Sequence, residues 1–171
     1  MQPVNWPNTT NYFLFYQLPL QYKIDLSGLK AKYFEYAKQF HPDFFTQDTQ
    51  SQGKALEISA INNRAFKILN NAISRLQYLL ELKNISLAEN STLPQSFLME
   101  MMELNEQIDE IDFADNKIEL ATLIANDIKA TQATMLNEIY TLAENNEWEK
   151  AKENLLKWRY LERLQERVSI N

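Results

Sequence analysis

The single histidine of this 171-residue chain, His41, stands directly before Pro42 and Asp43. These three residues are the strongest candidates for chemistry in the sequence. An anionic Asp43 could pair with the guanidinium of a partner, and a rigid Pro42 would hold the loop in one shape. A structural role is also compatible with the tripeptide alone, because a histidine near a helix C-terminus can cap its carbonyls. The elements on either side decide between the two roles.

Helical patterns flank the tripeptide. Asp25 can cap a helix that ends near Phe40, since the residue before a proline is pushed out of the helical region. A second helix is expected to close near Leu82, and residues 41–53 would form an exposed loop at the tip of the resulting antiparallel hairpin. A short helix near residues 12–17 would precede them. The apolar stripe of the second helix consists of Ile58, Ile61, Ala65, Ile68, Ala72 and Leu76.

An enzymatic role would use His41 as a base, Asp43 as its orienting carboxylate, and Ser51 or Ser59 as the nucleophile. Two residues on either side of a proline in one loop rarely direct their functional atoms at each other. No glycine-rich turn supplies an oxyanion or phosphate cradle, and the absence of cysteine removes thiolate metal sites. We therefore expect no catalysis, no ATP hydrolysis by the chain itself, and no metal or other cofactor.

Composition bounds the fold and the partners. The two glycines and five prolines leave little turn chemistry for short strands, which predicts an all-α fold. Residues 1–82 hold eight Lys and Arg against six Asp and Glu, whereas residues 83–171 hold nine against seventeen. The net charge of −6 argues against general nucleic-acid binding, and the opposite charges of the two halves indicate two different partners. The longest apolar run has five residues, so we expect a soluble, cytoplasmic protein without a membrane partner.

The second half of the chain is expected to form a three-helix bundle. Residues 83–94 lose helical periodicity and indicate a linker, and helices are predicted near 95–114, 116–145 and 147–168. The first of these has a seam at steps of four and three residues, made by Phe97, Met101, Leu104, Ile108 and Ile111.

The same helix carries further apolar residues off this seam. Leu98, Met99 and Met102 lie together on a neighbouring face, which could simply widen the core stripe. That face continues, however, into Glu103, Glu106 and Glu110. An apolar patch beside an acidic strip is typical of a binding surface.

The first half resembles the J-domain. The resemblance rests on Tyr12-Phe13, on the run YAKQFHPD at 36–43, and on INNRAFKIL at 61–69. It implies contact with the ATPase domain and interdomain linker of a 70-kDa heat-shock chaperone, in which His41, Pro42 and Asp43 trigger hydrolysis. The lysines of the preceding helix would meet an acidic surface of that chaperone; they are Lys30, Lys32 and Lys38.

One departure from the J-domain pattern concerns the residues after the tripeptide. Many J-domains have a lysine there, whereas this chain has Phe44 and Phe45, and Glu35 interrupts the basic helix. Binding to the chaperone would accordingly be weak or selective. Both phenylalanines are expected to pack back onto the hairpin.

The rear half extends the resemblance. Residues 97–110 (FLMEMMELNEQIDE) are similar to a segment of HscB-type co-chaperones of iron–sulfur cluster assembly. This implies an L-shaped, two-domain protein that binds an IscU-type scaffold protein and delivers it to an HscA-type chaperone, stimulating its ATPase. The resemblance implies four segments: an N-terminal extension at residues 1–10, a J-domain at 11–82, a linker at 83–94 and a three-helix scaffold-binding domain at 95–171.

The HscB-type resemblance also implies a scaffold contact made of Leu98, Met99, Met102, Glu103, Glu106 and Glu110, completed by Tyr160. Two alternatives stay open. The chain could be a passive helical adaptor in which the tripeptide is incidental, or a general J-domain co-chaperone without a role in iron–sulfur assembly.

Overall fold

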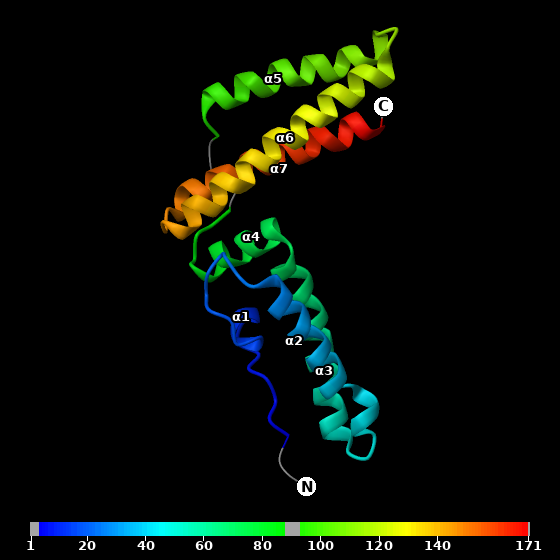
Figure 1. The fold of residues 1–171 in the computed structure, drawn as a ribbon, viewed down its shortest axis with the longest axis vertical. Helices are drawn as coiled ribbons and strands as arrows, with labels where there is room; N and C mark the ends of the chain where they lie inside the picture. The colour runs from blue at the N-terminus through cyan, green and yellow to red at the C-terminus, as the bar shows by residue number, and fades with distance from the viewer. Residues whose placement is uncertain (1–3, 88–92, 171) are drawn as a thin grey trace. The chain divides into compact units, whose positions relative to one another are not determined.

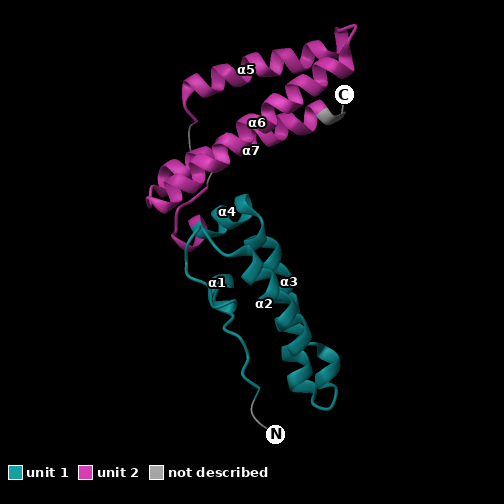
Figure 2. Ribbon diagram, in the orientation of Figure 1, with its two compact units in different colours: residues 1–79 teal, residues 80–171 magenta. Residues whose placement is uncertain are grey.

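The computed structural model describes residues 4–87 and 93–170. Helices and their connections account for all of this part of the chain, which confirms the predicted all-α fold. The chain divides into two compact units, residues 1–79 and 80–171 (Figure 2). The expected domain limits and the L-shaped arrangement stay predictions, and residues 88–92 of the expected linker lie outside the described residues. No helix in the described ranges is both long and apolar enough to cross a bilayer.

The N-terminal unit is built around a helical hairpin (Figure 1). Its two long helices, α2 and α3, run side by side and are joined through a short 3-10 helix, η1. The helices of this region are α1 (Tyr12–Phe15), α2 (Leu26–Gln39), η1 (Pro42–Phe45), α3 (Thr49–Asn70) and α4 (Ala72–Leu82).

The connection between α2 and α3 is shorter than the expected loop of residues 41–53. Asp48 is the N-cap of α3, and its carboxylate accepts hydrogen bonds from the backbone N–H of Gln50 (3.2 Å) and Ser51 (3.1 Å). The hydroxyl of Ser51 also donates to this carboxylate, and these hydrogen bonds lower the pKa of Asp48. Because the cap starts the helix at Thr49, Gly53 lies inside α3.

The second helix of the hairpin was predicted to run without a break to Leu82. This is wrong, because the segment forms two helices, α3 and α4. Asn71 has extended backbone (ψ 127°), and its side-chain oxygen accepts from the backbone N–H of Ser74 at 2.9 Å, which caps α4. The guanidinium of Arg75 is buried at this break. It donates to the carbonyl of Leu69 near the end of α3 (2.5 Å) and to that of Tyr22 (2.8 Å). The junction is therefore fixed by a buried side chain that satisfies one carbonyl at the end of α3 and one in the connection between α1 and α2.

Helix α1 is held against the hairpin by a buried polar network. The Tyr16 hydroxyl, fully buried, donates to the side-chain oxygen of Asn62 on α3 (2.6 Å) and lies 2.9 Å from its carbonyl oxygen. The Asn62 amide in turn donates to the carbonyl of Tyr33 on α2 (3.0 Å). Burial raises the pKa of Tyr16. One asparagine thus connects three helices, and its hydrogen bonds offset the cost of burying it.

The C-terminal unit contains the predicted three-helix bundle. It consists of α5 (Gln95–Glu110), η2 (Ile111–Phe113), α6 (Lys117–Glu144) and α7 (Trp148–Ile170). Helices α6 and α7 fall within two residues of the expected limits, whereas α5 ends four residues early and is continued by the 3-10 helix η2. The predicted seam of α5 faces the core, where Phe97, Met101 and Ile108 are buried and Leu104 packs against the cluster. Helices α6 and α7 contribute Ile124, Ile128, Leu161, Leu164 and Val168.

Replacing Arg75 with Ala should destabilise the protein by about 3 kcal/mol, because the buried carbonyls of Tyr22 and Leu69 would lose their donor. Urea denaturation measures the change in the free energy of unfolding. Arg64, exposed on α3, provides the control, and Arg64→Ala should cost no more than about 0.5 kcal/mol. Equal losses in the two variants would mean that the guanidinium does not hold the junction of α3 and α4.

Candidate functional site

The His-Pro-Asp tripeptide lies where α2 ends. The backbone N–H of Phe40 makes the last hydrogen bond to Tyr36 (3.0 Å), and the chain then turns into η1. The Nδ1 atom of His41 accepts from the backbone N–H of Asp43 (3.3 Å), so His41 is the N-cap of η1. The alternative role considered for His41, capping of helix carbonyls, is not the one observed here: the imidazole caps the start of the next turn. With Nδ1 accepting this hydrogen bond, Nε2 is the ring nitrogen that can donate to a partner.

Both ionisable side chains of the tripeptide face water. The side chains of His41 and Asp43 are 52% and 83% exposed, and Nδ1 lies 3.7 Å from the Asp43 carboxylate. The hydroxyl of Ser51, considered above as a nucleophile, donates instead to Asp48. The turn consequently presents a donor and a carboxylate to a partner, and does not assemble a base, an orienting group and a nucleophile.

The two phenylalanines after the tripeptide have different surroundings. Phe45 is half-buried, and its ring centroid lies 5.3 Å from that of Trp6 in residues 4–11, which we call the N-terminal arm. Phe44 is 70% exposed, with its ring edge-on to His41 at 5.9 Å. The expected packing of both rings is therefore wrong for Phe44. The contact with Trp6 had no sequence signal beyond the presence of a tryptophan in a segment without periodicity.

The three candidate lysines of α2 do not lie together. Lys30 and Lys38 are exposed and eight residues apart, so they share one stripe of the helix with Phe34, which is 59% exposed between them. Lys32 is half-buried on another side, and its ammonium donates to the carbonyl of Tyr16. The surface available to a partner thus combines two cations with an aromatic ring.

In the C-terminal unit, the candidate residues of α5 form one surface. Leu98, Met99 and Met102 are 39%, 58% and 64% exposed, which excludes the alternative that they widen the core stripe. At about 100° per residue, the candidate residues of α5 fall within an arc of about 140°, nearly opposite the buried seam. We call this surface the α5 face; it comprises Leu98, Met99, Met102, Glu103, Glu106 and Glu110.

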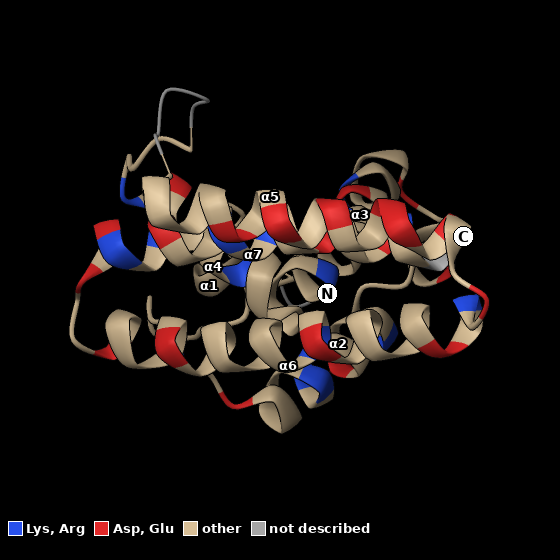
Figure 3. Ribbon diagram, turned by 90° about the horizontal axis from the view of Figure 1, so that it is seen from above, with Lys and Arg blue, Asp and Glu red and all other residues tan. Residues whose placement is uncertain are grey.

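The α5 face is acidic. Figure 3 shows acidic positions along α5, and the helix contains no Lys or Arg. Asp109, which was not among the candidate residues but falls within the same arc, pairs with Arg167 of α7 at 2.6 Å. Within the described residues, Glu103, Glu106 and Glu110 form no such ion pair. Their charges therefore stay available to a partner.

Tyr160 of α7 is not part of the α5 face. Its ring lies edge-on to that of Phe97 at 5.9 Å, and it packs against the core of the bundle. The guanidinium of Arg163 covers it at 5.3 Å. The structure therefore places Tyr160 on the side of α5 that faces α7, where it supports Phe97.

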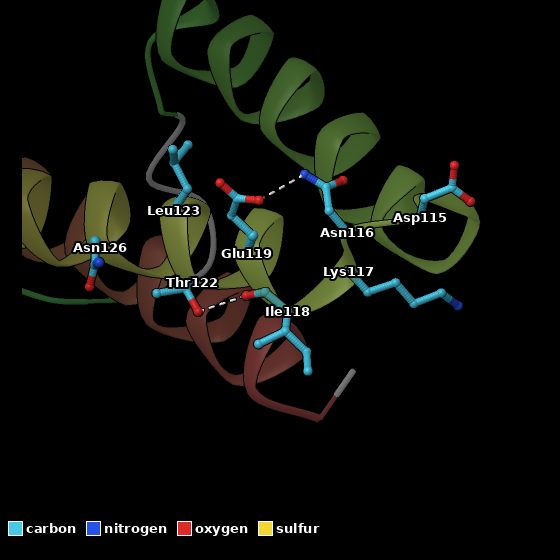
Figure 4. Close-up of a pocket in the computed structure, with 8 residues that line it drawn as sticks. All are labelled: Asp115, Asn116, Lys117, Ile118, Glu119, Thr122, Leu123 and Asn126. Atoms are coloured by element: carbon cyan, nitrogen blue, oxygen red, sulfur yellow. Dashed lines mark hydrogen bonds between the residues drawn. The ribbon is translucent and has the colours of Figure 1, made fainter.

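A further hollow of about 890 Å³, which the sequence did not predict, lies at the start of α6 (Figure 4). Two of its apolar side chains, Ile118 and Leu123, are 85% and 65% exposed. Its one hydroxyl, on Thr122, donates to the carbonyl of Ile118 (2.7 Å), and Glu119 accepts from the Asn116 amide (3.3 Å). Its only hydroxyl is therefore engaged, and its exposed apolar surface comes from Ile118 and Leu123. Across the described residues, no group of three or more His, Cys, Asp or Glu could hold a metal ion.

Known proteins similar to this chain include a family model that matches the second unit and solved structures that match nearly the whole chain. Residues 93–169 match the family model described as the HSCB C-terminal oligomerisation domain. The chaperone HscB from Vibrio cholerae is 26% identical, with a TM-score of 0.79 over 94% of this chain and 96% of that one. Human co-chaperone protein HscB is 28% identical, with a TM-score of 0.85 over 99% of this chain and 86% of the human one.

A helical hairpin with an exposed His-Pro-Asp turn, followed along the chain by three long helices, is the fold that the J-domain and HscB-type resemblances implied. The similarity to the HscB structures extends over nearly the whole chain, and the family model covers the second unit. This similarity supports the HscB-type resemblance that was predicted from the sequence.

Because Leu98, Met99 and Met102 are exposed, replacing all three with Ala should cost less than about 1.5 kcal/mol of stability. Met101, on the same helix, is 6% exposed and serves as the contrast. Met101→Ala should cost about 2–5 kcal/mol through loss of buried packing. Thermal and urea denaturation measure both. A larger loss in the triple variant than in Met101→Ala would place the α5 face in the core.

Proposed function

We propose that the chain binds an IscU-type scaffold protein through the α5 face and delivers it to an HscA-type chaperone in the cytoplasm. The His-Pro-Asp turn then stimulates the ATPase of that chaperone and so promotes cluster transfer. The observation that carries this proposal is the presence of a distinct exposed surface in each unit, an ordered polar turn in one and an apolar, acidic helix face in the other.

On the chaperone side, the proposal rests on the shape and charge of the turn. Asp43 presents a carboxylate that a guanidinium can take in a bidentate pair. Pro42 begins η1 and limits the conformations of the turn, so little ordering entropy is lost on docking. The exposed ammonium groups of Lys30 and Lys38 would favour encounter with an acidic surface.

On the scaffold side, the apolar residues would supply most of the binding free energy, and the acidic residues would raise the rate of association. Methionine side chains adapt to irregular surfaces, so Met99 and Met102 with Leu98 can fill shallow depressions on a partner. Burial of such anchors at an interface typically dominates binding energy. The charges of Glu103, Glu106 and Glu110 lie at the rim, where they mainly raise the association rate in a salt-dependent manner.

A passive adaptor would use the same two surfaces without changing ATP hydrolysis. The structure offers no separate reason for an ordered, exposed turn that carries all three residues of the tripeptide. Stimulation is therefore the better account of this turn. The two functions differ in one measurable quantity, the hydrolysis rate of the chaperone.

Replacing His41 with Gln should abolish stimulation of ATP hydrolysis, because the substitution removes the imidazole from an exposed position that a partner contacts. The fold should be retained, since the side chain is 52% exposed. Single-turnover hydrolysis by an HscA-type chaperone measures the effect. Gln47→Ala, at an exposed position of the same connection, should stimulate normally. Normal stimulation by His41→Gln protein would refute the proposed role of the turn.

The same triple alanine variant of Leu98, Met99 and Met102 should bind an IscU-type scaffold about a hundredfold more weakly. Each truncation at a buried contact costs about 1–3 kcal/mol. Calorimetry measures the affinity, and stimulation of the chaperone without scaffold should be unchanged. Replacing the exposed Ile118 and Leu123 with Ala in α6 is the matched control and should leave scaffold affinity intact. Unchanged affinity in the triple variant would move the scaffold site elsewhere.

A further inference from the structure

The N-terminal arm, residues 4–11, contacts the residues on either side of the His-Pro-Asp tripeptide. The ring of Trp6 lies 5.5 Å from that of Phe40 and 5.3 Å from that of Phe45 (centroid distances). Phe40 directly precedes the tripeptide, and Phe45 is the last residue of η1. A single indole therefore connects the two residues that bracket the turn.

The two bracketing residues are held to different degrees. Phe40 is 2% exposed and belongs to the buried aromatic packing of the unit, with Tyr36 at 5.5 Å. Phe45 is only half-buried. Trp6 thus attaches the less restrained end of the turn to the more restrained one.

The turn packs against α3, but few hydrogen bonds of its own hold it. They run from the backbone N–H of Phe44 to the His41 carbonyl (3.0 Å), from that of Asp43 to the His41 ring (3.3 Å), and from that of Asp48 to the Phe45 carbonyl (3.3 Å). The first two are at exposed residues, where water competes for the same groups. A four-residue 3-10 helix is not stable alone, because each hydrogen bond must offset the ordering of several dihedral angles. Its shape therefore depends on packing from elsewhere.

The arm is seated in a way that leaves the rest of the candidate surface open. Residues Asn5, Trp6 and Pro7 line a groove of about 430 Å³ together with Glu35 and Gln39 of α2. At helical spacing, these two positions lie on a different side of α2 from the stripe of Lys30, Phe34 and Lys38. The arm can thus support the turn without covering Lys30 or Lys38, whereas the half-buried Lys32 lines the same groove.

We infer that Trp6 is a positioning residue for the His-Pro-Asp turn, which it holds in the conformation that docks on the chaperone. This inference rests on the proposed function of the turn. Trp6 would not contact the reacting nucleotide. Without Trp6 the turn samples other conformations. The apparent affinity for the chaperone then falls in proportion to the fraction of molecules whose turn is in the docking conformation. The maximal stimulation at saturation is retained, because the docked state is the same.

The test compares Trp6→Ala, Trp6→Phe and Val4→Ala in the full chain. Val4, 42% exposed in the same arm, is the matched control. Aromatic packing of the strength expected for two ring contacts corresponds to about a tenfold effect. For Trp6→Ala we expect the amides of residues 43–45 to exchange hydrogen about tenfold faster, with those of α3 unchanged. The concentration of co-chaperone for half-maximal ATPase stimulation should rise about tenfold at unchanged maximum. Trp6→Phe should restore most of both, and Val4→Ala should match wild type.

Two results would overturn the inference. One is Trp6→Ala protein with wild-type exchange in the turn and a wild-type half-maximal concentration. The other is loss of protection throughout the N-terminal unit, which would make Trp6 a general stabilising residue. Failure of the proposed function looks different, because wild-type protein would then fail to stimulate an HscA-type chaperone at all. In that case the exchange rates of residues 43–45 alone decide whether Trp6 holds the turn.

Discussion

The buried aromatic packing between α1 and α2 is the interaction on which the N-terminal unit depends. Tyr36 lies at its centre, 5.3 Å from Phe15, 5.8 Å from Tyr16 and 5.5 Å from Phe40. Rings in such a cluster have few alternative rotamers and lose packing if one of them moves. Because Phe40 is the last member and the tripeptide follows it directly, the core fixes the point from which the turn starts. The turn can therefore be exposed and still be ordered.

Helix α5 meets a related constraint, because one of its faces packs in the core while another leaves apolar residues exposed. Phe97, Met101 and Ile108 face inward, while Leu98 and Met102 are exposed on the other side. A helix with apolar residues on two faces is ambiguous in composition, since both sets could belong to a wide core stripe. The regular steps of four and three residues identified the inward set. What the remaining apolar residues contact depends on a partner, and their exposure is the physical reason to expect one.

The fold could be predicted from the sequence where the pattern is local and periodic, as in the all-α class and the helices of the second unit. The prediction failed where a tertiary contact overrides the periodic pattern. The apolar stripe runs in phase through Asn71, so the break there follows from the Asn71 cap and the buried Arg75, which no periodicity contains. The loop before α3 was predicted too long because the cap by Asp48 was missed. Trp6 could not be assigned, because its partners are about 35 residues away in a segment without a repeat.

Charge counts also overstate the basic surface of α2. Lys32 is engaged by the Tyr16 carbonyl, so Lys30 and Lys38 stay exposed, with the exposed ring of Phe34 between them. Phe44 is likewise exposed where many J-domains have a lysine. An interface with fewer cations and more aromatic surface gains less from long-range attraction and more from shape. Affinity then depends strongly on how well the turn is ordered before docking, since ordering it on contact would consume binding energy. In such an interface, a packing contact that holds the turn affects recognition as directly as a residue that touches the partner.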